Sequence, residues 1–178
     1  MKVSGFTFVR NAVLYDYPLV EAITSILPLC DEVVVAVGNS DDDTLELIQS
    51  IPSDKIKIIE TTWDDNLREG GQVLAEETNK AFQAIDPESD WAFYIQGDEV
   101  IHEQDIPVIK EAMQSILQID EADGILFKYR HFYGSYDYIG TASSWYPETE
   151  FCYMRNDQGF FFAAKGGYNG ESHNHNDM

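Results

Sequence analysis

Five short apolar segments alternate with segments whose apolar residues recur at helical spacing, and this order restricts the fold more than any other feature. The strand-like segments are Lys2–Val9, Glu32–Val37, Lys55–Glu60, Trp91–Ile95 and Gly124–Arg130. Helical spacing occupies each interval between them. An alternating order of this kind predicts right-handed crossovers and a mostly parallel sheet. We therefore expect an α/β, Rossmann-like fold with helices on both faces of the sheet.

Residues 131–178 have a different character, because they are rich in aromatic residues and glycine and show no helical pattern. Two short strands are predicted here, Glu150–Arg155 and Gly159–Ala164, forming an antiparallel hairpin. The aromatic segment Tyr129–Tyr138 precedes them and suits either stacking on sugar rings or packing at a sheet edge. No internal repeat and no Pro- or Ser-rich linker interrupts the chain. The sequence thus predicts a single domain over residues 1–178, with a small antiparallel C-terminal part.

The segment Trp91–Val100 contains the strongest candidate for a functional site. Its apolar half suits a strand buried on both faces, and Gln96 and Gly97 end that run. Asp98 and Glu99 follow at once, where ligands bind in open α/β sheets, beyond the carboxyl ends of the strands. A carboxylate pair on a rigid strand suits a hard divalent cation and the phosphates it carries. The alternative is a solvated pair where a strand meets a loop, and the local sequence leaves both open.

The charge of the chain limits its partners. Eleven basic residues stand against 32 acidic ones, which gives a formal net charge of -21. Such a field repels nucleic acid and anionic membrane surfaces, and it also repels a nucleotide unless a cation intervenes. We therefore expect no nucleic-acid partner.

Cysteine use and hydropathy favour a cytoplasmic protein. Cys30 and Cys152 are the only cysteines and are typical of reduced core residues, although a single disulfide between them remains open. No apolar run approaches membrane-spanning length. The first residues read as a strand rather than as a leader.

Four segments taken in order resemble the GT-A glycosyltransferases, and within them the family two transferases of bacterial surface polysaccharides. The resemblance covers roughly Met1 to Asp137. The segments that carry it are Phe6–Ala12, Val33–Glu46, Trp63–Phe82 and Tyr94–Val100.

The resemblance implies a nucleotide-sugar donor bound over the carboxyl edge of the sheet, with Mn²⁺ or Mg²⁺ bridging its diphosphate. Asp98 and Glu99 take the place of the metal ligands. By position, the implied nucleotide contacts are Arg10 and Asn11 on the nucleotide side, Asn39 and Asp41 at the base and ribose, and Trp63, Arg68 and Gly71 near the ribose or diphosphate.

The sequence departs from the family pattern in three places. Gln96 replaces the first acid of the usual Asp-x-Asp, although its amide still offers a carbonyl oxygen. Gly38 and Asn39 replace the acidic residues often found after the second strand. The acceptor region, about residues 131–178, is shorter than in the family, as in a short or truncated member.

The reaction implied by the resemblance is the transfer of a sugar to a saccharide or other hydroxyl acceptor, with inversion at the anomeric carbon. A carboxylate must then accept the proton of the acceptor hydroxyl. Glu148, Glu150 and Asp137 are the candidates, and surface acids beside a strand are the alternative for each. Two other functions remain open: a catalytically weakened domain that binds a sugar or a partner, and a nucleotidyltransferase-like enzyme.

Overall fold

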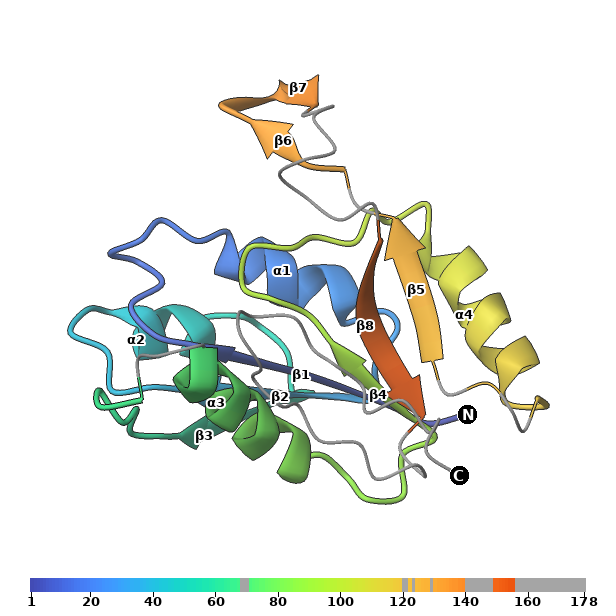
Figure 1. The fold of residues 1–178 in the computed structure, drawn as a ribbon, viewed down its shortest axis with the longest axis horizontal. Helices are drawn as coiled ribbons and strands as arrows, with labels where there is room; N and C mark the ends of the chain where they lie inside the picture. Colours follow the sequence, from blue (N-terminus) through green and yellow to red (C-terminus); the bar gives the residue numbers. More distant parts are fainter. Residues whose placement is uncertain (68–70, 120–121, 123, 129, 140–148, 156–178) are drawn as a thin grey trace.

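The structure is a computed structural model that describes residues 1–67, 71–119, 122, 124–128, 130–139 and 149–155. Helices and strands alternate through the first two thirds of the chain, and the elements described after α4 are strands (Figure 1). The elements are β1 (Val3–Val9), α1 (Leu19–Ile26), β2 (Glu32–Val37), α2 (Thr44–Gln49), β3 (Ile56–Glu60), α3 (Gln72–Gln83), β4 (Trp91–Tyr94), α4 (Ile106–Ile116), β5 (Gly124–Lys128), β6 (Phe132–Tyr133), β7 (Ser135–Ile139) and β8 (Thr149–Arg155).

Six of these strands form one sheet in the order β3-β2-β1-β4-β8-β5. The pairs β3–β2, β2–β1 and β1–β4 are parallel. Strand β8 is antiparallel to both of its neighbours, β4 and β5. The α/β fold with a mostly parallel sheet is therefore confirmed.

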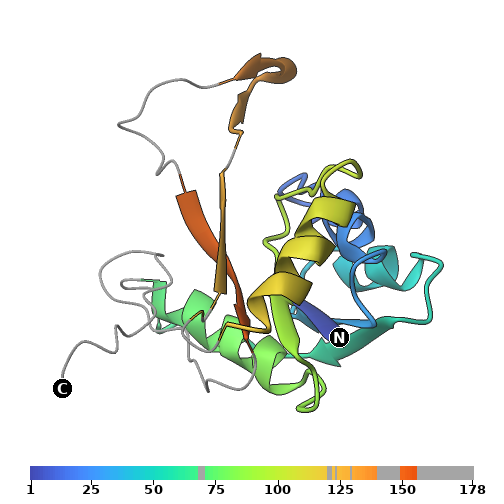
Figure 2. The same cartoon turned by 90° about the vertical axis from the view of Figure 1, so that its right-hand side faces the viewer.

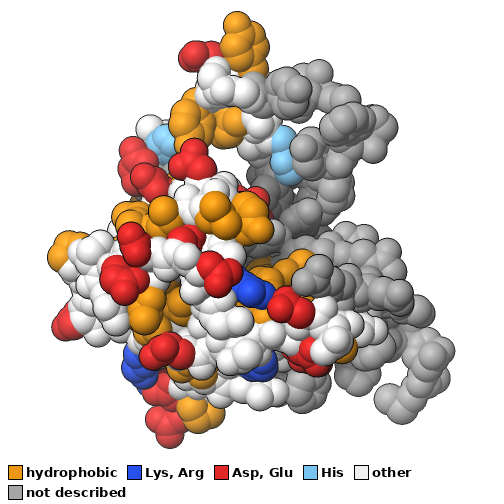
Figure 3. Space-filling view, turned by 90° about the vertical axis from the view of Figure 1, so that its left-hand side faces the viewer, with side chains coloured by type: hydrophobic (Ala, Val, Ile, Leu, Met, Phe, Trp, Pro, Cys, Tyr) orange, Lys and Arg blue, Asp and Glu red, His pale blue; other side chains and the backbone are white. Residues whose placement is uncertain are grey.

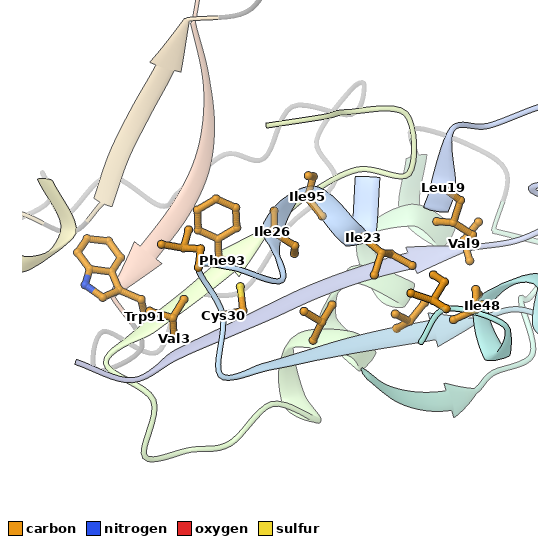
Figure 4. Close-up of a cluster of buried hydrophobic side chains, with 14 of the residues drawn as sticks. Val3, Val9, Leu19, Ile23, Ile26, Cys30, Ile48, Trp91, Phe93 and Ile95 are labelled. Atoms are coloured by element: carbon orange, nitrogen blue, oxygen red, sulfur yellow. The ribbon is translucent and has the colours of Figure 1, made fainter. Parts of the chain in front are cut away.

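The two faces of the sheet pack against different helices because side chains alternate along each strand. On β2, Val33, Val35 and Val37 face the core that α1, α2 and α4 help to form, whereas Val34 and Ala36 face α3. Figure 4 shows the first of these cores, with helix residues such as Ile23 and Ile48 against the sheet. Each fully buried aliphatic side chain contributes about 1.5–3 kcal/mol. Helices on both faces thus explain why β2 is apolar from Val33 to Val37.

The place of β8 differs from the expected hairpin. Residues Glu150–Arg155 do form a strand, but β8 lies between β4 and β5 and separates β5 from the parallel strands. The predicted partner segment, Gly159–Ala164, lies outside the described residues. Local periodicity predicts that a segment is a strand, but it carries no information on which distant strand becomes its neighbour.

Strands β6 and β7 form a separate two-stranded hairpin that stands away from the main sheet (Figures 1 and 2). Gly134 makes its turn with a φ of 73°, a value that favours glycine. The hairpin exposes Tyr136 (79%), Tyr138 (68%) and Phe132 (49%). These three aromatic side chains are therefore not core residues.

The described helices are short. The longest, α3, has 12 residues, whereas a bilayer-spanning helix needs about 20. Within the described part of the chain, no helix is long and apolar enough to cross a membrane.

The thiol of Cys30 lies inside the core and is free, so no disulfide with Cys152 forms. Burial raises the pKa of this thiol above its ordinary value. A protonated, buried thiol is unreactive, as expected for a structural cysteine.

Candidate functional site

The candidate site lies at the carboxyl edge of the parallel strands. Val9, Val37 and Glu60 are aligned across β1, β2 and β3, so the residues that follow them emerge side by side. The N–H of Gly38 donates to the Val9 carbonyl (2.8 Å), and that of Thr61 donates to the Val37 carbonyl (2.8 Å). The side of the molecule seen in Figure 3 contains this edge, and acidic side chains are scattered over it between hydrophobic ones.

Arg10, Asn39 and Trp63 meet at this edge although they come from three different loops. Arg10 Nε donates to the Asn39 carbonyl (3.1 Å), and the guanidinium lies 5.8 Å from the centre of the Trp63 ring. The N–H of Trp63 donates to Asn39 Oδ1 (3.1 Å). Arg10 also forms an ion pair with Asp65 (3.2 Å). Three residues predicted to contact the nucleotide therefore form one cluster.

The indole of Trp63 lies directly against Gly38. A Cβ on Gly38 would come within 2.4 Å of Trp63 Nε1 and 2.7 Å of Cδ1, so only glycine leaves room for the ring. The ring of Phe8 lies 5.9 Å from that of Trp63 on another side. Trp63 Nε1 is buried and has no hydrogen-bond partner. Glycine at position 38 thus leaves the space that the Trp63 ring occupies.

Asn11 joins the loop after β1 to the loop after β2. Its Oδ1 accepts a hydrogen bond from the N–H of Asp41 (2.7 Å), and its own N–H donates to Ser40 Oγ (3.0 Å). Asn11 is 7% exposed and has a φ of 55°, which asparagine tolerates better than most residues. The side chain therefore braces two loops, while that of Asp41 is exposed.

Asp42 strengthens the same connection. Its carboxylate accepts hydrogen bonds from the N–H of Leu14 (2.7 Å), the N–H of Thr44 (3.1 Å) and the Thr44 hydroxyl (2.5 Å). Burial alone would raise the pKa of this carboxyl, but the hydrogen bonds from Thr44 and the backbone outweigh it and hold the pKa below its ordinary value.

We expect Asp42→Ala to lower the free energy of unfolding by about 1–2 kcal/mol at pH 7, because it leaves these donors without an acceptor. Folding lowers the pKa of the Asp42 carboxyl. Its contribution to the free energy of unfolding is therefore fully present above the unfolded-state pKa of about 3.9, and is lost as the pH falls through the folded-state pKa. Urea denaturation from pH 7 to pH 3 measures both effects. Asp43→Ala is the control, because Asp43 precedes α2 without a side-chain capping bond. Equal losses in the two variants would contradict the bracing role.

In the turn after β4, the side chains of Asp98 and Glu99 have different surroundings. Glu99 Oε2 accepts a hydrogen bond from the N–H of Gln96 (2.9 Å), and the Glu99 N–H donates to the Gln96 carbonyl (3.2 Å). The Asp98 side chain is exposed. Glu99 thus holds the turn, and Asp98 is the carboxylate presented to solvent.

The donor groups at this turn fit one kind of metal site. Within the described residues no group of three or more His, Cys, Asp or Glu residues is placed to hold a metal ion. Mg²⁺ and similar cations are instead often held by one or two carboxylates together with substrate phosphates and water. The exposed carboxylate of Asp98 would suit such a substrate-completed site and not a closed protein cage.

The other predicted site residues are less closely grouped. Gly71 lies at the amino end of α3 with a φ of 71°. Asp137 is exposed on β7, in the hairpin that stands away from the sheet. Glu150 belongs to β8 and is paired through its backbone with Phe127. Because β8 is antiparallel to β4, Glu150 lies toward the side of the sheet at which β4 ends. Arg68 and Glu148 lie outside the described residues.

One buried acid near the site, Glu77, was missed by the sequence reasoning. Glu77 lies on the inner side of α3, where Ala81 and Thr78 are also buried. An acid among the apolar positions of an amphipathic helix was the available signal.

No family model and no curated protein matches this sequence. Among solved structures, S. aureus TarS matches with a TM-score of 0.58 and 18% identity, over 92% of this chain and 31% of the TarS chain. TarS 1-349 in complex with UDP-GlcNAc matches with a TM-score of 0.59 and 19% identity, over 92% and 49%. The chain thus spans a third to a half of these proteins.

A further match is 4-diphosphocytidyl-2C-methyl-D-erythritol synthase from Anaerococcus prevotii DSM 20548. Its TM-score is 0.52 at 10% identity, over 88% of this chain and 70% of that one. At such identities the likeness establishes a shared fold.

Proposed function

We propose that residues 1–178 form a nucleotide-sugar-binding domain of the GT-A type, and that the protein is a metal-assisted, inverting glycosyltransferase acting on a saccharide or other hydroxyl acceptor. The observation that carries this proposal is the convergence of Arg10, Asn39 and Trp63 at the carboxyl edge. It is supported by the fold shared with TarS, which has been crystallised with UDP-GlcNAc.

The cluster has the chemistry to hold a nucleotide. The partly exposed indole of Trp63 provides an aromatic surface for a base or ribose, and Arg10 provides positive charge beside it. Arg10 is already paired with Asp65, so it offers only part of its charge to a diphosphate. A cation at Asp98 would neutralise the remaining phosphate charge and the charge that develops on the leaving group.

The acceptor side of the proposal rests on less closely placed groups. The exposed aromatic hairpin of β6 and β7 presents Tyr136 and Tyr138, whose faces suit sugar rings. Glu150 is our first candidate for the base that accepts the hydroxyl proton, because β8 brings its backbone toward the end of β4 at which Asp98 lies. Glu148 and Asp137 are the other candidates.

A nucleotidyltransferase-like activity is the second candidate function. The fold shared with the diphosphocytidyl-methylerythritol synthase supports it, because that enzyme is named for a product that carries a diphosphocytidyl group. The same edge and the same cation would then serve a nucleoside triphosphate. A catalytically weakened binding module is the third candidate, and the replacement of the usual acid by Gln96 supports it.

Calorimetric titration with UDP and GDP, with and without MnCl₂, tests the proposal. We expect one of the two nucleotides to bind at least about tenfold more tightly with manganese, because an edge this acidic repels a bare diphosphate. Incubation with sugar nucleotides or with nucleoside triphosphates, followed by product analysis, then separates the first two functions. Absence of binding under all four conditions would contradict the glycosyltransferase proposal.

A further inference from the structure

Glu77 is a buried carboxylate that the proposed chemistry does not use. Its exposed fraction is 0%, although it belongs to a helix with ample solvent-facing positions. Burying a charged side chain is costly unless the charge is paired and hydrogen-bonded. An apolar residue would pack α3 against the sheet without that cost, so the acid needs another explanation.

Both carboxylate oxygens of Glu77 are engaged, and their contacts converge on one loop. Oε2 accepts a hydrogen bond from the Thr61 hydroxyl (2.5 Å). Oε1 accepts one from Lys80 Nζ (2.5 Å), and Lys80 Nζ also lies 3.5 Å from the Thr62 carbonyl. The first two residues after β3 are therefore fixed to α3, Thr61 through its side-chain hydroxyl and Thr62 through its backbone carbonyl.

Trp63 is the next residue of this loop. It is held on its other side by Asn39 and rests on Gly38. Trp63 therefore lies between an anchor in the loop after β2 and an anchor on α3. We propose that Glu77 is a positioning residue, which fixes the start of the loop so that the Trp63 indole stays over Gly38 and beside Arg10. Its role in substrate binding rests on the proposed nucleotide site.

The test compares Glu77→Gln with Glu76→Gln, which makes the same change of charge at the neighbouring, exposed position of the same helix. Glutamine keeps the shape and one acceptor, but it cannot pair with Lys80 as an anion. The chain has three tryptophans, so 5-fluorotryptophan labelling gives three ¹⁹F resonances, and Trp63→Phe assigns that of Trp63. These spectra are recorded without nucleotide.

We expect Glu77→Gln to shift or broaden the Trp63 resonance and to leave the other two unchanged, while Glu76→Gln changes none of them. With manganese present, UDP or GDP affinity should fall about tenfold in Glu77→Gln and stay unchanged in Glu76→Gln. An unaltered Trp63 resonance in Glu77→Gln would overturn the positioning role. If the wild-type protein binds neither nucleotide, the proposed function fails, yet the spectra still decide whether Glu77 positions the ring.

Thr61→Val provides a second route if Glu77→Gln does not fold. It removes the hydroxyl that contacts Glu77 Oε2 but keeps the branched shape and the backbone bond to Val37. The same selective change at Trp63 supports the proposal. A Thr61→Val spectrum identical to that of the wild type would overturn it.

Discussion

Replacement of Asp98 by Asn is expected to abolish metal-dependent nucleotide binding. Substitution of a residue that only supports a metal ligand costs up to about 100-fold in metal affinity, so loss of the ligand itself should cost at least about 100-fold. The side chain is exposed at the end of β4, so its removal should change the free energy of unfolding by no more than about 0.5 kcal/mol. Titration with UDP or GDP in MnCl₂ and thermal unfolding measure the two effects.

Asp54→Asn is the matched control for this experiment. Asp54 is exposed and precedes β3, at the opposite edge of the sheet, and the substitution removes the same charge. It should leave both nucleotide affinity and stability unchanged. A large loss of stability in Asp98→Asn, or an equal loss of affinity in Asp54→Asn, would show that Asp98 acts through the fold or through net charge and not as a ligand.

Gly38→Ala should be the most damaging of the small substitutions. The new Cβ would lie 2.4 Å from Trp63 Nε1, far inside van der Waals contact. The ring must move, which costs about 1–3 kcal/mol for such overpacking, and the contact with Arg10 is lost with it. We expect a lower urea midpoint, a shift in tryptophan fluorescence and weaker nucleotide binding.

Gly97→Ala makes the same chemical change where there is room. Its nearest neighbour would be Leu19 Cδ1 at 3.5 Å, an ordinary contact, and neither glycine has a positive φ. Stability should therefore stay equal or rise by up to about 1 kcal/mol. If the two alanine variants unfold at the same urea concentration, Trp63 is not tightly seated on Gly38.

The sequence predicted those features that depend on local periodicity or on shared strand direction. Val33–Val37 could be identified as buried, and the meeting of Arg10, Asn39 and Trp63 follows because the ends of parallel strands share an edge. The insertion of β8 beside β4 could not be predicted, since it depends on pairing between segments about 60 residues apart. Glu77 differs, because an acid among the apolar positions of α3 was a local signal.

Side-chain direction was a second limit. Asn11 and Glu99 were expected to contact a ligand; Asn11 Oδ1 accepts a hydrogen bond from the N–H of Asp41 in the neighbouring loop, and Glu99 Oε2 accepts one from the N–H of Gln96 in its own turn. Such contacts depend on φ and ψ within the turn, which residue type alone does not determine. Asp98 and Glu99 are both carboxylates, and in this turn Glu99 accepts the Gln96 N–H whereas Asp98 is exposed.

The contacts of Asn11, Asp42 and Thr44 couple the conformations of the loops after β1 and β2. These residues make four of the hydrogen bonds between the loops: one in each direction at Asn11, one from the Ala12 N–H to the Thr44 hydroxyl, and one from the Leu14 N–H to the Asp42 carboxylate. Neither loop can lengthen or change its turn without breaking bonds in the other. Insertions tolerated during divergence should therefore occur in both loops together, or elsewhere in the chain.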